Sequence, residues 1–225
     1  MMNFLSHFYF ERNNPDVNMI LGVVLPDFIK NADKNCNLYP LKDRQLFENH
    51  EAQSGIWKGW ERHVKVDGLF HNSEFFTAKT STLKQLLLPV MEGSPVKPFF
   101  LAHIGLELIL DHLLTINADV NIDRFYEALT EADKVALEAF LQNCAMSDTS
   151  SFFKFLNSFI SSKYLFSYQK IENISYALNR ICMRLWAQPF TDKQLDLLTA
   201  QIDLFKEDLQ PDYPAIFAEI ELQLK

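Results

Sequence analysis

Apolar side chains recur at helical spacing through most of this chain, and no two segments alternate like paired strands around a short turn. The helices predicted by this spacing include residues 46–76, 77–90, 96–116, 152–161, 168–187 and 191–209. A content of only 6 glycines against 20 phenylalanines disfavours Gly-rich nucleotide-binding folds and favours a large aromatic core. At roughly 150 residues per domain, the length predicts one all-α domain over 1–225, built as a helical bundle.

Charge and cysteine content exclude several classes of protein. The formal net charge is −8, and an acidic chain lacks the basic field that general nucleic-acid binding requires. Cys36, Cys144 and Cys182 are odd in number and show no CxxC spacing, which is typical of reduced thiols. The first residues also lack the basic region of a secretory signal, so we expect a cytoplasmic protein. Because of the acidic net charge, we expect no nucleic-acid partner.

The longest apolar run, residues 99–114, carries four ionisable side chains. We expect it to be too short to span a bilayer, and therefore expect no membrane partner. It contains His103, Glu107, Asp111 and His112. Because burying a carboxylate is costly unless it is paired or bound to a cation, this run is a candidate for a functional site.

Two segments carry histidine and acid at intervals of four residues. They are His63, Asp67 and His71 in one segment and His103, Glu107 and Asp111 in the other. Each step of four advances about 40° around a helix, so each set lies on one face. Imidazole nitrogen and carboxylate oxygen are ligands of Zn, Mn and Fe(II), and two such faces turned toward each other would form a cage. The alternative for His63 and Asp67 is an exposed pair that stabilises the helix by a few tenths of a kcal/mol.

Other candidate residues are open to two interpretations. Asp27, which follows a proline, either caps a turn or adds a carboxylate at the mouth of the site. His7, in an apolar segment, is typical of a core histidine, and His50 lies among charged residues and is expected at the surface. The chain has no GxSxG motif, no cysteine near a histidine and no Gly-rich phosphate loop.

Five short blocks, in the same order and at similar spacing, resemble the acyl carrier protein phosphodiesterase family. They are the opening MNFLSH at 2–7, the Gly and Asp-Phe of 21–28, the Gly, His and Asp of 59–67, the Asp-His block of 107–114 and the Leu-Asn and Arg of 164–184. The resemblance extends over about residues 2–188.

This resemblance implies an all-helical, HD-phosphohydrolase-like fold and a specific activity. The family removes the 4′-phosphopantetheine group from holo acyl carrier protein with Mn²⁺, and Mg²⁺, Fe²⁺ or Zn²⁺ would suit similar ligands. The implied metal ligands are His7, Asp27, His63, Asp67, Asp111 and His112. Asp67, Asp111 and Arg184 are the implied catalytic residues, with Arg184 as a phosphate contact. His71, His103 and Glu107 are expected to surround the ligands and orient them.

The chain departs from the family pattern at three positions near these residues. His71 stands where the family has an acidic residue, and Glu107 stands where the family has an aspartate. Val64 replaces one of two basic residues of the family pattern. These changes leave two alternatives: hydrolysis of another small phosphoester or nucleotide, or a helical binding module without turnover.

A carrier-protein substrate is itself acidic, so this chain must offer it a local basic face. Candidates are Lys58, Arg62, Lys65, Lys154, Lys163, Lys170, Arg180 and Arg184.

Overall fold

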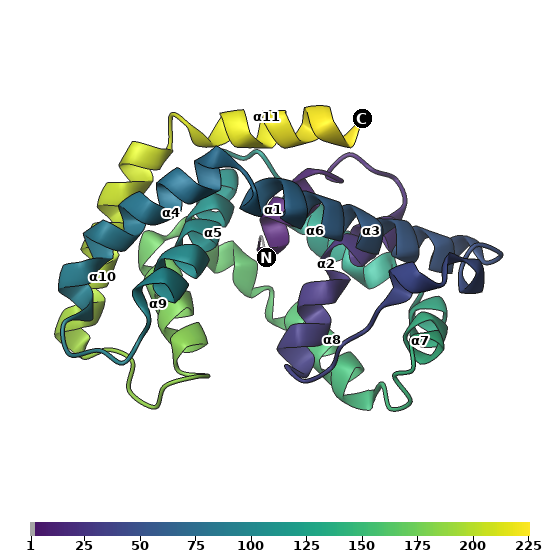
Figure 1. Cartoon of the computed structure of the whole chain (residues 1–225). Helices are drawn as coiled ribbons and strands as arrows, with labels where there is room; N and C mark the ends of the chain where they lie inside the picture. The colour runs from purple at the N-terminus through teal and green to yellow at the C-terminus, as the bar shows by residue number, and fades with distance from the viewer. Residues whose placement is uncertain (1–2) are drawn as a thin grey trace. The chain divides into compact units, whose positions relative to one another are not determined.

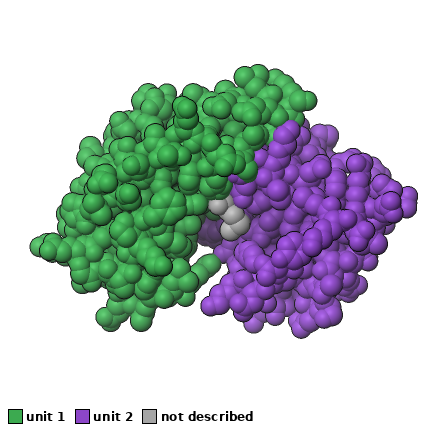
Figure 2. Space-filling view, in the orientation of Figure 1, with its two compact units in different colours: residues 1–3, 68–119, 166–225 green, residues 4–67, 120–165 purple. Residues whose placement is uncertain are grey.

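The computed structural model describes residues 3–225, which form helices α1 to α11 and short 3-10 turns without any strand (Figure 1). The all-α prediction is therefore confirmed. The chain divides into two compact units (Figure 2). Unit 2 comprises residues 4–67 and 120–165, and unit 1 comprises residues 68–119 and 166–225 together with Asn3. The prediction of a single domain over 1–225 stays a prediction.

Unit 2 is organised around phenylalanine side chains. Its helices are α1 (Phe4–Tyr9), α2 (Val17–Ala32), most of α3 (Glu51–His71), α6 (Ile122–Glu131), α7 (Lys134–Asn143) and α8 (Ser150–Ser162), with 3-10 turns at Pro40–Lys42 and Arg44–Leu46. The rings of Phe28 and Phe159 have centroids 4.6 Å apart, and Phe8 lies 5.1 Å from Phe125. Aromatic contacts of this kind join α1, α2, α6 and α8, as the phenylalanine content predicted.

Two glycines let α2 and α3 approach until their backbones touch. A Cβ atom added at Gly59 would lie 2.3 Å from the carbonyl oxygen of Met19, and one at Gly22 would lie 2.4 Å from that of Ile56. Helix α2 continues through Pro26 to Ala32, so the proline does not end it. Because the two helices pack so closely, the turn of α3 that follows Gly59 faces the backbone of α2.

Unit 1 surrounds the apolar helix α5. Its helices are the end of α3, α4 (Glu74–Leu87), α5 (Pro98–Ile116), α9 (Ile171–Cys182), α10 (Asp192–Leu209) and α11 (Tyr213–Leu224), with a 3-10 turn at Leu88–Met91 and most of the one at Tyr164–Gln169. Helix α5 packs against α4 and α9. A capping box of Thr191 and Gln194 opens α10.

Several boundaries differ from the sequence prediction. Helix α3 begins at Glu51 because a 3-10 turn precedes it, and it ends at His71 because Ser73 caps the next helix. Helix α5 has 19 residues, so by length and composition alone it could cross a membrane, and our expectation on its length was wrong. Because 67% of its most apolar window is buried against the rest of the protein, it has the environment of a core helix.

Candidate metal centre

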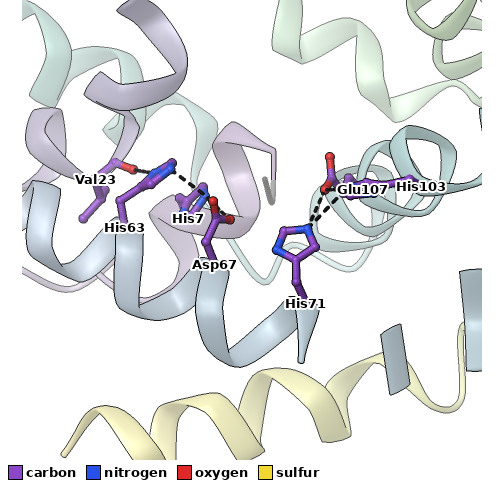
Figure 3. A network of polar contacts seen from close by, with 7 residues as sticks. All are labelled: His7, Val23, His63, Asp67, His71, His103 and Glu107. Atoms are coloured by element: carbon purple, nitrogen blue, oxygen red, sulfur yellow. Dashed lines mark hydrogen bonds and ion pairs between the residues drawn. The ribbon is translucent and has the colours of Figure 1, made fainter. Parts of the chain in front are cut away.

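Helices α1 and α3 bring His7, His63 and Asp67 together in unit 2. His7 Nε2 lies 3.4 Å from Asp67 Oδ1, and His63 Nε2 lies 3.5 Å from Asp67 Oδ2. The two imidazole rings are stacked, with centroids 3.8 Å apart and planes inclined by 18°. Figure 3 shows His63 and Asp67 projecting from successive turns of α3. The spacing of four residues therefore places both side chains on one face, as predicted.

The distances from both histidine nitrogens to Asp67 are those that one ion requires, and the three ligand atoms all lie within 4.8 Å of one another. Ligands at about 2.1 Å from a tetrahedral metal ion lie about 3.4 Å from each other. His63 Nδ1–H donates to the carbonyl oxygen of Val23 at 2.8 Å, which leaves Nε2 of the neutral ring with its lone pair (Figure 3). Neither ring nitrogen of the buried His7 makes a hydrogen bond to any of the described residues 3–225. A metal ligand role accounts for such a nitrogen, because an unsatisfied buried polar atom is costly.

The electrostatics of His7 and Asp67 favour the protonation states that bind a cation. Burial, with help from His63, lowers the pKa of His7 to about 4, although Asp67 opposes the change. Burial would raise the pKa of Asp67, but its contacts with His63 and His7 outweigh this effect and hold the pKa far below its ordinary value. His7 is therefore neutral and Asp67 is charged near pH 7.

Asp27 lies buried on α2 in the same unit and acts on His63 through its charge. Burial lowers the pKa of His63, but the hydrogen bond that the ring donates to Asp67 and the charge of Asp27 more than compensate, so the pKa is raised. Asp27 does not belong to the group of ligand atoms within 4.8 Å of one another that the described residues form in unit 2. Its proximity supports the interpretation of a carboxylate beside the site, and its role as a ligand stays a prediction.

In unit 1, the three residues expected to orient the ligands form a group of their own. His71, at the end of α3, contacts His103 and Glu107 of α5 (Figure 3). The other residues implied as site members are elsewhere in this unit. Asp111 is fully buried on α5, and Arg184 is exposed just after α9.

His112, next to Asp111 on α5, is held like a ligand. Its Nδ1–H donates to the carbonyl oxygen of Tyr168 at 2.7 Å, and burial lowers its pKa, so Nε2 carries a lone pair. Asp111, His112 and Arg184 are in neither of the two groups that the described residues form, and their roles stay predictions.

A cavity of about 330 Å³ adjoins the trio in unit 2. Its lining comprises Pro26, Leu38, Tyr39, Leu41, Lys42, Trp60, His63, Val64 and Asp67. Residues 31–45 lie outside the helices that the sequence predicts, so sequence reasoning missed Tyr39 and Lys42. Three other lining residues share one face of α3, because they follow each other at steps of four and three: Trp60, Val64 and Asp67. That shared face was the sequence signal available for the cavity wall.

The basic residues of α3 differ in their exposure and in their ion pairing. Lys58 and Lys65 are exposed, whereas Arg62 forms an ion pair with the buried Glu11, with 3.0 Å between Nε and Oε1. The positive charge of Arg62 is therefore compensated within unit 2. His50 is exposed, as predicted.

Comparison with known proteins gives one match. A family described as acyl carrier protein phosphodiesterase matches residues 2–220. No curated protein and no solved structure gives a significant match. Because the family match covers nearly the whole chain and includes all the residues of the trio, this chain belongs to the acyl carrier protein phosphodiesterase family.

Proposed function

We propose that this chain hydrolyses the phosphodiester that links phosphopantetheine to a serine of holo acyl carrier protein, using a divalent metal ion. The observation that carries the proposal is the group of His7, His63 and Asp67 beside a cavity in unit 2. The family to which the chain belongs supports the phosphodiesterase activity and the carrier-protein substrate. The mixed nitrogen and oxygen donors suit Mn²⁺, our first choice, and also Fe²⁺ or Zn²⁺, with Mg²⁺ as a further alternative.

The residues of the trio each have a distinct task in this proposal. A bound divalent ion supplies Lewis acidity toward the phosphate and lowers the pKa of water. The hydrogen bond to Val23 fixes the ring orientation of His63, and burial keeps His7 neutral. Asp67 supplies the negative charge and remains 21% exposed, so this side of the group is open to substrate and water.

The adjoining cavity suits the phosphopantetheine arm. Its size falls in the usual range of ligand pockets, about 300–1,000 Å³. Tyr39, Leu41 and Trp60 provide apolar walls for the carbon chain of the arm. Lys42 is the cation of this lining, and its Nζ lies 4.6 Å from the ring centroid of Tyr39. We assign Lys42 to the phosphate, a contact that we had expected of Arg184.

Lys58 and Lys65 are the basic residues we assign to the acidic carrier protein. Both are exposed on α3 in the same unit as the trio. A local positive patch raises the association rate with an acidic partner even when the net charge is −8. We place this reaction in the cytoplasm, with neither a nucleic acid nor a membrane as partner.

The test is incubation of the full chain with holo acyl carrier protein and Mn²⁺, followed by mass spectrometry of the carrier protein. We expect apo carrier protein to appear, and we expect His63→Gln and Asp67→Asn to slow its formation by at least ~100-fold. His50→Gln, at an exposed histidine of the same unit, is the matched control.

Two further results would replace this proposal with its alternatives. Cleavage of a simple phosphodiester without any action on holo carrier protein would indicate another phosphoester substrate. A chain that binds the carrier protein but neither binds metal nor cleaves either substrate would be a binding module. Charge reversal at Lys58 and Lys65 should weaken carrier-protein turnover and leave cleavage of the simple phosphodiester unchanged.

A further inference from the structure

His71, His103 and Glu107 form a closed triangle of donor atoms in unit 1. The Nε2 atoms of the two histidines are 3.2 Å apart. Glu107 Oε1 lies 3.2 Å from His71 Nε2 and 2.8 Å from His103 Nε2. The three donor atoms therefore lie close to one another, and the three side chains come from the end of α3 and from two successive turns of α5 (Figure 3).

Protons alone cannot satisfy all three contacts of this triangle. A neutral imidazole has one N–H, so its Nε2 either donates or accepts. If both Nε2 atoms donate to Glu107, two N–H groups face each other across 3.2 Å. If only His71 carries a proton on Nε2, it donates that proton either to Glu107 or to His103. In both cases the lone pair of His103 Nε2 faces the carboxylate oxygen of Glu107. Every arrangement of neutral rings leaves one repulsive contact, whereas a cation at the centre attracts all three lone pairs.

We propose that His71, His103 and Glu107 bind a second divalent ion, with zinc as the preferred metal. Donor atoms at about 2.1 Å from an ion lie between about 3.0 Å apart in octahedral geometry and about 3.4 Å apart in tetrahedral geometry. The two contacts of 3.2 Å fall in this range, and the contact of 2.8 Å between His103 and Glu107 is slightly shorter. Two imidazoles and one glutamate are a known three-ligand set of zinc, and they leave the fourth position to water or another ligand.

The surroundings of the triangle strengthen the attraction for a cation. Glu107 is only 5% exposed, and its contacts with His103 and His71 outweigh burial and keep its pKa low. The ring of Phe76 stands at a steep angle to both imidazole rings, inclined by 74° and 76°, with centroids 4.7 Å and 5.0 Å away. Apolar walls lower the local dielectric and exclude competing water.

The same group remains accessible to an ion from solvent. The imidazole side chains of His71 and His103 are 23% and 24% exposed. A bound ion would tie the last residue of α3 to α5 within unit 1 and would thereby stabilise that unit. This site shares no ligand with the trio of unit 2, so it adds to the proposed function and does not depend on it.

The test measures zinc bound by the full chain after treatment with a chelator, by titration against a chromophoric competitor and by elemental analysis. We expect His71→Gln and His103→Gln each to remove one zinc equivalent, or to weaken it by at least ~100-fold, and to leave the other equivalent in place. His63→Gln should show the opposite pattern, and His50→Gln should bind as the unchanged chain does.

Cobalt provides a readout that a structural role alone would not move. Co²⁺ in place of zinc should give visible absorption that includes a component lost in His103→Gln and retained in His63→Gln. Circular dichroism of each metal-free variant establishes that it is folded. Equal zinc stoichiometry and affinity in the unchanged chain, His71→Gln and His103→Gln would overturn the proposal.

Discussion

Replacement of Gly59 by alanine tests the backbone contact that supports the candidate metal centre. A Cβ atom at this position would lie 2.3 Å from the carbonyl oxygen of Met19 and 2.6 Å from Cα of Gly22. Both are backbone atoms, so they cannot rotate away. To restore an ordinary contact of 3.4 Å from 2.3 Å, helices α2 and α3 must separate locally by about 1 Å.

The expected cost follows from two opposing effects. Overpacking of this kind costs about 1–3 kcal/mol, while the higher helix propensity of alanine gains about 1 kcal/mol. We therefore expect the free energy of unfolding to fall by up to about 2 kcal/mol. Because His63 lies one turn further along α3, its 2.8 Å hydrogen bond to Val23 should also lengthen. Loss of such an orienting bond typically weakens metal binding by about 10–100-fold.

Gly68→Ala is the matched control, because it lies on the same helix. No atom lies within 4 Å of a Cβ added at Gly68, so this variant should gain about 0.5–1 kcal/mol. Urea denaturation measures both stabilities, and calorimetric titration with Mn²⁺ measures the affinity. If Gly59→Ala were as stable as Gly68→Ala and bound Mn²⁺ as tightly as the unchanged chain, the reasoning from helix contact would be refuted.

Three further predictions concern buried groups. His7 has a pKa of about 4 in the folded chain against an ordinary 6.5, so the unfolded state takes up the proton first as the pH falls. The contribution of neutral His7 to the free energy of unfolding is complete above pH 6.5 and falls by up to about 3 kcal/mol toward pH 4 in the metal-free protein. His7→Gln should flatten this dependence in urea titrations at several pH values. Tyr126→Phe removes the hydroxyl that accepts from Leu165 N–H at 3.2 Å and should lower the free energy of unfolding by about 1–2 kcal/mol, whereas an unchanged urea midpoint would show that the bond contributes little. Burial raises the pKa of Cys182 to about 12, so a thiol reagent at pH 8 should modify the partly exposed Cys36 first, and equal rates in the native protein would contradict this.

The helical class of this protein was predictable from local patterns. Spacing of three and four residues, the scarcity of glycine and the Thr191–Gln194 cap are properties of short segments, and the structure confirms the helices they indicated. The pairing of His63 with Asp67 was predictable for the same reason, because residues four apart on a helix are neighbours wherever that helix lies.

The environment of these residues was less predictable. His7 is interpreted from sequence alone as a core histidine, yet its ring stacks on His63, which is far along the chain. The family resemblance, rather than the local pattern, pointed to His7 as a ligand. Leu38, Tyr39, Leu41 and Lys42, which line the cavity, lie in or just before the short 3-10 turn Pro40–Lys42, where no periodic pattern marked them.

His71 illustrates the limit of reasoning from helical faces. Its spacing places it in register with His63 and Asp67, but it is the last residue of α3 and its contacts are with His103 and Glu107. Helical periodicity determined which side chains share a face, because that depends only on the 3.6-residue turn. Which faces meet, and at what distance, depends on long-range packing such as the contact of Gly22 with Gly59, and only the tertiary structure decided it.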